Sequence, residues 1–339
     1  MNDRRVVFPS AWHAQWEEVA LPDRPGPGQL LVRTLLTMVN YGTVVAIYTG
    51  THININRPGV WPKYPHHPSG HSVGVVCAVG EGVMGYAEGD RVSFNGRYCR
   101  YQLWDLPASR IVKVPQDVSD LEAVVAAHAS ISLHGVRLAH MTIGERVIVF
   151  GAGVIGLCAA LYALAAGAVL VAVVDPVETR LRVARECGVD CTLNPEKVDV
   201  EAEAKALTDG KGFDVAIEAT GAPAVLPAAL HVTCPLGRVV ILGSPRGKVE
   251  LDTYNDVHRG GISLIGAHGG TAPGQENAYY PWSTERNIAT GWELVRRGRL
   301  SFAKLVTHRI KANETLIGLF DRLAKEPDQY LGVVIDWAS

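Results

Sequence analysis

The sequence predicts an α/β protein in which a doubly wound parallel sheet is joined to a β-rich domain. From residue 119 to residue 266, strand-like apolar runs alternate with helix-like segments, which is the pattern of parallel strands joined by crossover helices. The residues before this region hold short strand-like runs broken by glycine and proline, and another strand-like run ends the chain. A length of 339 residues suits two domains.

The first part of the chain is predicted to be β-rich. Strand-like runs occupy residues 6–8, 30–34 and 73–80, and prolines interrupt the sequence between them. Residues 44–48 form a run that is too short to assign. After Asp117 the composition becomes helical: Ser119 and Glu122 can cap a helix over residues 123–129, and a second amphipathic stretch reaches His140.

The centre of the sequence alternates strands and helices. Strands are predicted over residues 146–150, 168–174, 214–221, 237–243 and 262–266, and helices over residues 157–167 and 178–186. A long loop over residues 267–282, a helix over 288–297 and a strand over 333–337 complete the chain. We therefore expect the doubly wound domain over residues 119–266, and one β-rich domain built from residues 1–118 and 267–339.

A glycine-rich turn joins the first central strand to its helix. Gly151, Gly153 and Gly156 have the spacing G-x-G-x-x-G, with Val154 and Ile155 between them at the start of the predicted helix. Such glycines permit a tight turn, close approach of the backbone to a pyrophosphate, and close packing of helix on strand. The phosphates would lie at the helix N-terminus. This context predicts a Rossmann dinucleotide-binding domain.

An aspartate at the end of the next strand supports this prediction. Asp175 follows Gly156 by nineteen residues, where a carboxylate accepts hydrogen bonds from the adenosine ribose. A carboxylate there repels a 2′-phosphate, so NAD is favoured over NADP. Arg180 and Arg182, one helical turn further on, leave NADP possible, although they are also typical of a solvated helix surface.

Composition and charge exclude several classes of protein. The formal net charge of −2 gives no electrostatic footprint for nucleic acid or an anionic membrane surface. No apolar run approaches the ~18 residues of a spanning helix, and the N-terminus does not resemble a signal segment. We expect a cytoplasmic protein. Its six cysteines form no C-x-x-C pair, so we expect neither a disulfide nor a cysteine-built structural zinc site.

Seven short motifs follow one another along the chain, at residues 41–50, 70–74, 89–92, 151–156, 174–175, 218–221 and 305–309. Taken in this order, they resemble the medium-chain dehydrogenase/reductase superfamily, and the zinc alcohol and polyol dehydrogenases in particular. The resemblance implies a chaperonin-10-like (GroES-like) catalytic domain made from both ends of the chain, a nicotinamide cofactor, a small-molecule substrate, and a homodimer or homotetramer. It also implies that small residues after the strands, and a histidine beside them, meet the cofactor: Thr220, Gly243, Ser244, Ala267 and His268.

The sequence departs from the zinc enzymes of this superfamily at the metal. Tyr41 stands where those enzymes have a cysteine ligand, Ser72 stands near the position of a glutamate or water, and only His71 matches a ligand. One histidine with a tyrosine and a serine is a poor set for zinc. His66, His67 and His128 leave a rebuilt site open. We expect no zinc, as in a zinc-free branch similar to bacteriochlorophyllide-dehydrogenase-like and sugar or cyclitol oxidoreductases.

Without a metal, a protein group must stabilise the charge that develops on the substrate oxygen during hydride transfer. Tyr41 is the first candidate for the acid/base, Thr43 matches the superfamily's relay hydroxyl, and His71 is the proton acceptor or an orienting group. The structural alternatives are a packed aromatic ring for Tyr41, a turn-capping hydroxyl for Thr43, and a hydrogen-bonded core histidine for His71.

The substrate is expected to contact a polar, aromatic segment of the first domain together with the long loop. Buried donors suit a polyhydroxylated ligand, although plain surface polarity is the competing interpretation. The candidates are His52, Trp61, His66, His67 and Trp282, with Asn56 among the polar residues between them.

We thus predict an NAD(P)-dependent, zinc-independent oxidoreductase that interconverts a secondary alcohol and a ketone on a sugar, cyclitol or aminocyclitol-like molecule. The alternatives are a zinc-free enone or quinone reductase using NADPH, and a cofactor-binding protein without catalysis.

Overall fold

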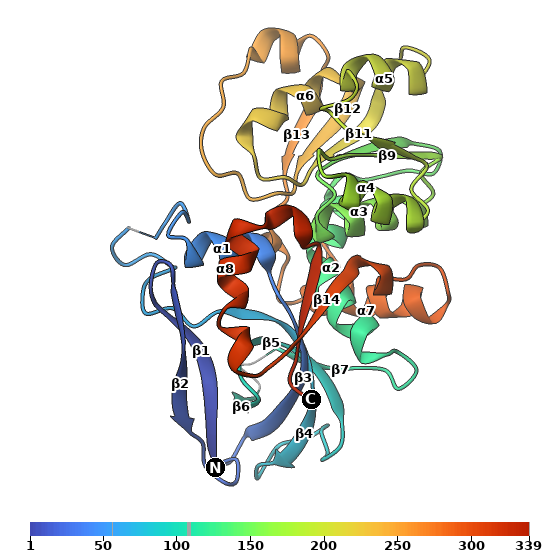
Figure 1. The fold of residues 1–339 in the computed structure, drawn as a ribbon. Helices are drawn as coiled ribbons and strands as arrows, with labels where there is room; N and C mark the ends of the chain where they lie inside the picture. The colour runs from blue at the N-terminus through green and yellow to red at the C-terminus, as the bar shows by residue number, and fades with distance from the viewer. Residues whose placement is uncertain (56, 107–109, 339) are drawn as a thin grey trace. The chain divides into compact units, whose positions relative to one another are not determined.

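The computed structural model describes residues 1–55, 57–106 and 110–338, so Asn56 lies outside the described residues. The chain divides into two compact units, residues 1–128 with 306–339, and residues 129–305. Figure 1 shows the β-rich and the α/β parts of the chain. No helix in the described part of the chain is long and apolar enough to cross a membrane.

The first unit is built from strands of both ends of the chain, which pair antiparallel except for β14 and β15, which are parallel. Strands β1 and β2 form a hairpin, and a seven-stranded sheet has the order β14-β15-β3-β4-β5-β7, with β6 paired to β3. The C-terminal strand β15 adds antiparallel to β3, with Val334 opposite Met38. The elements are β1 (Asn2–Ser10), β2 (His13–Ala20), β3 (Gln29–Met38), α1 (Tyr41–Tyr48), β4 (Ser69–Val79), β5 (Arg91–Arg97), β6 (Tyr101–Asp105), β7 (Ile111–Lys113), β14 (Val306–Lys311), α8 (Leu319–Lys325) and β15 (Gly332–Asp336).

The second unit is a doubly wound parallel sheet. Its strand order is β10-β9-β8-β11-β12-β13, and every neighbouring pair is parallel. The order reverses between β8 and β11, which is where ligands bind in such sheets. The elements are β8 (Arg146–Phe150), α3 (Val154–Ala165), β9 (Leu170–Val174), α4 (Glu178–Glu186), β10 (Cys191–Leu193), α5 (Val200–Leu207), β11 (Phe213–Glu218), α6 (Leu226–His231), β12 (Thr233–Ile241), β13 (Ser263–Gly266) and α7 (Thr284–Arg296).

Each unit has its own apolar core. In the first unit, Phe8, Tyr98 and Phe320 are fully buried, and the rings of Phe8 and Phe320 meet edge to face with centroids 4.9 Å apart. In the second unit, β-branched and small residues of the sheet are buried on both faces, as expected for parallel strands covered by helices. The predicted fold class is therefore confirmed.

One long helix replaces the two that the sequence predicted before the glycine turn. Helix α2 runs without a break over Asp120–Leu138, and Ser119 caps it through a 3.2 Å hydrogen bond from the Glu122 amide. Two polar side chains in the second half of this helix are hydrogen-bonded to other segments. The Ser132 hydroxyl donates to the Ile155 carbonyl at 2.7 Å, and His134 is hydrogen-bonded at both ring nitrogens.

The segment after β13 belongs to the second unit, which differs from the predicted boundary at residue 267. His134 of α2 explains the difference, because its ring hydrogen-bonds Tyr280 and Thr271, each at 2.9 Å. Helix α7 is held to α2 as well, since Arg137 donates to Thr290 at 3.1 Å. These contacts depend on pairs more than 130 residues apart in sequence, which local composition does not reveal.

Candidate functional site

The glycine turn between β8 and α3 has the form that the sequence suggested. Gly151 has φ +97°, and a Cβ on Gly156 would lie 1.8 Å from the Gly151 carbonyl oxygen, so no other residue fits there. A Cβ on Gly153 would meet no atom of the described residues within 4 Å, its own chain neighbours aside. The missing side chain at Gly153 therefore leaves space open at the N-terminus of α3, which begins at Val154 and carries Ile155 in its first turn. This geometry fits a pyrophosphate.

Asp175 is fixed at the end of β9 by the backbone. Its carboxylate is 4% exposed and accepts hydrogen bonds from the Ala152 amide at 2.7 Å and the Val177 amide at 2.8 Å. The Arg180 guanidinium lies 3.9 Å from the same carboxylate. The backbone of the glycine turn thus holds a carboxylate beside it, and the second lone pair of each oxygen can accept a ribose hydroxyl.

The remaining cofactor candidates gather at the same edge of the sheet, because parallel strands end together. The side chain of Glu218 is buried and accepts from the amides of Thr220 at 2.6 Å and Gly221 at 3.0 Å, which folds the chain after β11. A Cβ on Gly243 would lie 2.4 Å from the Gly221 nitrogen, so the ends of β11 and β12 require a glycine at this contact.

Three candidates differ in their exposure at this edge. Ser244 is exposed, whereas Ala267 is buried and its amide donates to the Ile241 carbonyl at 2.9 Å. His268 is exposed, and its Nδ1 accepts from the Gly270 amide at 3.1 Å. The backbone of Ala267 and the hydroxyl of Ser244 suit contact with a carboxamide, and the His268 ring shapes its own turn. Glu218 holds the turn after β11 through its hydrogen bonds to backbone amides. It belongs to the motif at residues 218–221, but no role was predicted for it from the sequence.

Two histidines of the first unit, His71 and His128, lie side by side. The Nδ1 atoms of His71 in β4 and His128 in α2 lie 3.3 Å apart, and their rings meet edge to face. Burial lowers the pKa of His71 to about 4 and that of His128 to about 3, the latter helped by the His71 charge. Both rings are therefore neutral at pH 7. His128 is 3% exposed and His71 is half-buried, so His71 is the more accessible ring.

A hydrogen bond between two neutral imidazoles requires opposite tautomers. One Nδ1 carries the proton and donates it, and the other Nδ1 accepts it. Consequently one ring has a bare Nε2 that can accept a proton, while the other has an Nε2–H that can donate one. The pair can act as a proton acceptor or a hydrogen-bond donor without carrying charge at neutral pH.

Tyr41 and Thr43 stand at the start of helix α1. The Tyr41 hydroxyl donates to the Leu323 carbonyl of α8 at 2.5 Å, and its ring packs against the core of the first unit. The phenol proton is therefore used in a hydrogen bond that joins α1 to α8. Thr43 is half-buried in the first turn of α1. The geometry therefore favours His71 over Tyr41 as the acid/base.

The residues at the superfamily's metal position do not fit zinc. Ser72 is fully buried, and its hydroxyl is hydrogen-bonded to Thr37 at 2.9 Å and to the Gly70 carbonyl at 3.1 Å. The Tyr41 hydroxyl is bonded to Leu323, so the candidate metal ligands at this position are the ring nitrogens of His71 and His128. Within residues 1–55, 57–106 and 110–338, no three His, Cys, Asp or Glu side chains are placed to hold a metal ion. A catalytic zinc needs three protein ligands.

The substrate candidates are divided between the two units. Trp61 lies between His52 and His66, with ring centroids 5.3 and 6.0 Å away, so these three form one aromatic cluster in the first unit. Burial, with the charges of His67 and His52, lowers the pKa of His66 to about 4. His67 instead bonds Glu17 at 2.9 Å. Trp282 belongs to the second unit, where its indole is covered by the Arg137 guanidinium.

Replacing Tyr41 by phenylalanine tests whether the phenol is chemical or structural. We expect turnover at saturating substrate to fall less than about tenfold, and the free energy of unfolding to fall by about 1 kcal/mol for the lost hydrogen bond. Steady-state kinetics and urea unfolding measure the two effects. A rate loss above about a hundredfold at unchanged stability would return Tyr41 to the acid/base role.

Two family models match the chain: the alcohol dehydrogenase GroES-like domain over residues 26–116 and the zinc-binding dehydrogenase over residues 154–285. The chain is 29% identical over 332 residues to the L-threonine 3-dehydrogenase of Pyrococcus furiosus, with 88% of each chain covered. It is 32% identical over 237 residues to the D-guloside 3-dehydrogenase of Escherichia coli K12, with 69% of this chain and 67% of that one covered.

Solved structures share the whole fold. The 2R,3R-butanediol dehydrogenase of Bacillus subtilis superposes with a TM-score of 0.83 at 25% identity, over 99% of both chains. A Sinorhizobium meliloti protein bound to NADP gives 0.81 at 22% identity over 99% of this chain and 100% of that one. An Escherichia coli alcohol dehydrogenase complexed with NADH gives 0.80 at 19% over 99% of each.

Fold and site together define a two-domain, nicotinamide-dependent dehydrogenase. The chain belongs to the medium-chain dehydrogenase/reductase superfamily, as the order of its motifs suggested. It is an enzyme of the alcohol dehydrogenase type.

Proposed function

We propose that this enzyme interconverts a secondary alcohol and a ketone on a sugar, cyclitol or similar polyhydroxylated molecule, with NAD as cofactor and without zinc. The observation that carries the proposal is the neutral pair of His71, which matches a metal ligand of the superfamily, and the buried His128 beside it. This pair supplies both a proton acceptor and a hydrogen-bond donor.

The histidine pair accounts for the proton that leaves the alcohol. When bound, the nicotinamide ring takes up or gives back a hydride. As the hydride leaves the carbinol carbon, His71 accepts the hydroxyl proton at its ring nitrogen, and the Nδ1 contact to His128 orients the ring. Because neither ring is charged at neutral pH, His71 is ready to act as a base in the oxidising direction. In the reducing direction the protonated ring returns the proton to the ketone oxygen.

The cofactor preference follows from Asp175. Its carboxylate is buried beside the glycine turn and is already directed by two backbone amides, so a ribose with free hydroxyls fits and a phosphorylated ribose meets negative charge. The Arg180 guanidinium lies 3.9 Å from this carboxylate and partly offsets its negative charge. The carboxylate still occupies the position beside the ribose. We infer that NAD binds more tightly than NADP.

The substrate class rests on the aromatic cluster of His52, Trp61 and His66 and on the relatives. Trp61 is 58% exposed, which leaves an indole face for the apolar face of a sugar or cyclitol ring. The His52 and His66 rings flank it, and the ring nitrogens of His66 suit hydroxyl groups. D-guloside 3-dehydrogenase and L-threonine 3-dehydrogenase, by their names, act on hydroxyl-bearing compounds, which agrees with this class.

A spectroscopic screen tests the function. The purified enzyme is assayed for NADH formation with a panel of sugars, cyclitols and simple secondary alcohols, and for NADPH consumption with conjugated enones and a quinone. We expect turnover in the polyol arm. Turnover restricted to the enones would assign a reductase, and cofactor binding without turnover in either arm would assign a non-catalytic protein.

Replacing Asp175 by serine tests the cofactor preference. The substitution removes the negative charge, so the ratio of kcat/KM for NAD to that for NADP is expected to fall at least about tenfold. Asp175 also holds the Ala152 and Val177 amides, so some stability will be lost with either cofactor. The ratio cancels that loss. An unchanged ratio would mean that Asp175 does not distinguish the ribose of NAD from the phosphorylated ribose of NADP.

A further inference from the structure

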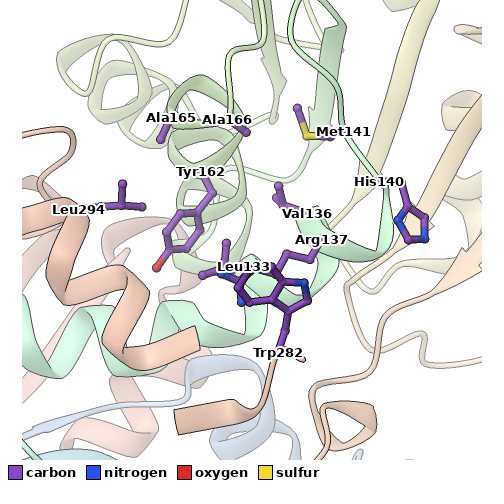
Figure 2. A pocket seen from close by; sticks show the side chains of 10 residues that line it. All are labelled: Leu133, Val136, Arg137, His140, Met141, Tyr162, Ala165, Ala166, Trp282 and Leu294. Atoms are coloured by element: carbon purple, nitrogen blue, oxygen red, sulfur yellow. The ribbon is translucent and has the colours of Figure 1, made fainter. Parts of the chain in front are cut away.

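The second unit contains a pocket whose wall holds none of the residues that we propose for proton transfer or for the cofactor. Trp282, the one substrate candidate in this wall, lies under the Arg137 guanidinium. The pocket has a volume of about 280 Å³, and α2, α3 and α7 supply most of its walls, as Figure 2 shows. This volume is close to the lower end of the ~300–1,000 Å³ typical of small-molecule sites. The lining residues are Leu133, Val136, Arg137, His140, Met141, Tyr162, Ala165, Ala166, Trp282 and Leu294.

A guanidinium without a carboxylate partner lies in this wall. Arg137 lies on the face of the Trp282 indole, with its Cζ 3.6 Å from the ring centroid, and it donates to the Asn287 and Thr290 side chains. Burial lowers the pKa of Arg137 to about 10, so the group remains a cation at neutral pH. Among the described residues, none of the ion pairs includes Arg137. Three of its five N–H donors remain available.

Two further polar groups beside Arg137 are buried donors without acceptors. The Tyr162 hydroxyl and the Asn287 amide nitrogen have no hydrogen-bond partner in the described part of the chain. Tyr162 is 2% exposed and Asn287 is 1% exposed. Burial raises the pKa of Tyr162 well above its ordinary value, so this hydroxyl keeps its proton. Arg137 and Tyr162 line the pocket, whereas Asn287 stands behind Arg137 and accepts a hydrogen bond from it. The pocket wall therefore offers a positive charge and a hydroxyl donor, which an anion with acceptor oxygens would satisfy.

The rest of the wall is apolar. Leu133, Val136 and Leu294 give it aliphatic surface, while Ala165 and Ala166 at the end of α3 leave it open. A planar carboxylate matches the fork of a guanidinium, and the indole and aliphatic walls suit a compact apolar body. We propose that this pocket binds a small monocarboxylate with an apolar body, its carboxylate on Arg137. The proposal is independent of the proposed substrate and of zinc.

Titration calorimetry of the full-length protein tests this proposal with two carboxylates and their neutral amides. Benzoate and 3-methylbutanoate are compared with benzamide and 3-methylbutanamide, which keep the shape and lose the charge. We expect at least one carboxylate to bind at least tenfold more tightly than its amide. Equal binding of acid and amide, or no binding of either acid, would overturn the proposal.

Two variants locate the binding. Arg137→Met removes the cation, and Ala165→Leu fills the pocket from an exposed helical position without touching a polar group. Each is expected to weaken carboxylate binding at least tenfold, whereas Arg182→Met, which removes an exposed guanidinium on α4, leaves it unchanged. If Arg137→Met fails to fold, Ala165→Leu decides alone. Carboxylate binding that survives Ala165→Leu would place the site elsewhere and refute the assignment.

Discussion

Replacing His71 by asparagine is expected to lower kcat by about 10²- to 10⁴-fold, the usual contribution of a general acid or base. Asparagine keeps a hydrogen-bonding group opposite the His128 Nδ1 and removes the nitrogen that accepts the proton. The fold should survive, because His71 is half-buried and lies in the middle of a regular strand pair opposite Asn95. Steady-state kinetics with the best substrate of the polyol screen measure the effect.

A control and a pH series accompany this variant. His231→Gln changes an exposed histidine on α6 and should leave kcat unchanged. In the parent enzyme, oxidation of the alcohol should be flat from neutral pH to about pH 5 and fall near pH 4, as the base with the lowered pKa becomes protonated. A His71→Asn enzyme with kcat within about threefold of the parent would contradict the proton-acceptor role.

The free energy of unfolding should also depend on pH through His71. The unfolded chain binds a proton at an ordinary pKa of 6.5, whereas burial lowers the pKa of His71 to about 4 in the folded state. The stabilising contribution is therefore complete above pH 6.5 and is lost as the pH falls from 6.5 toward 4. His71→Asn should flatten this part of the unfolding curve.

Replacing Gly156 by alanine is the second large change we expect. A Cβ there would lie 1.8 Å from the Gly151 carbonyl oxygen, so β8 and α3 must separate or the turn must rearrange. The expected cost is about 3 kcal/mol or more of unfolding free energy, with loss of detectable NAD binding. Urea unfolding and calorimetric titration with NAD measure the two quantities.

Gly153→Ala provides the matched comparison in the same turn. Its Cβ would meet no atom of the described residues within 4 Å, its own chain neighbours aside, and its backbone at φ −68° is accessible to alanine. Stability should therefore stay within about 0.5 kcal/mol of the parent, while NAD binding weakens because the methyl group occupies the space of the phosphates. Equal stability losses in the two variants, or unchanged NAD binding by Gly153→Ala, would contradict this account of the turn.

The sequence predicts best what depends on neighbouring residues. Helix α4 begins and ends where its composition indicates, at Glu178 and Glu186. The glycine turn could be predicted from the sequence because its three glycines lie within six residues. The short run after residue 40 could not be assigned because helix α1 is specified by its packing on α8, whose residues lie about 280 positions away.

The site was only partly predictable for the same reason. His71 and His128 are separated by 57 residues, and neither spacing nor composition indicates that their Nδ1 atoms meet. Tyr41 was favoured by its position, but the bond of its hydroxyl to Leu323 depends on the far end of the chain. The stacking of Arg137 on Trp282 is likewise visible only in three dimensions.

We propose above all that the imidazoles of His71 and His128 stabilise the charge on the substrate oxygen, which a metal cation stabilises in the zinc enzymes of the superfamily. Metal analysis of the enzyme, purified without added metal and assayed before and after dialysis against a chelator, tests it most directly. We predict well under one divalent ion per chain and an unchanged rate after chelation. One tightly held zinc per chain, with activity lost on its removal and regained on its return, would contradict the account.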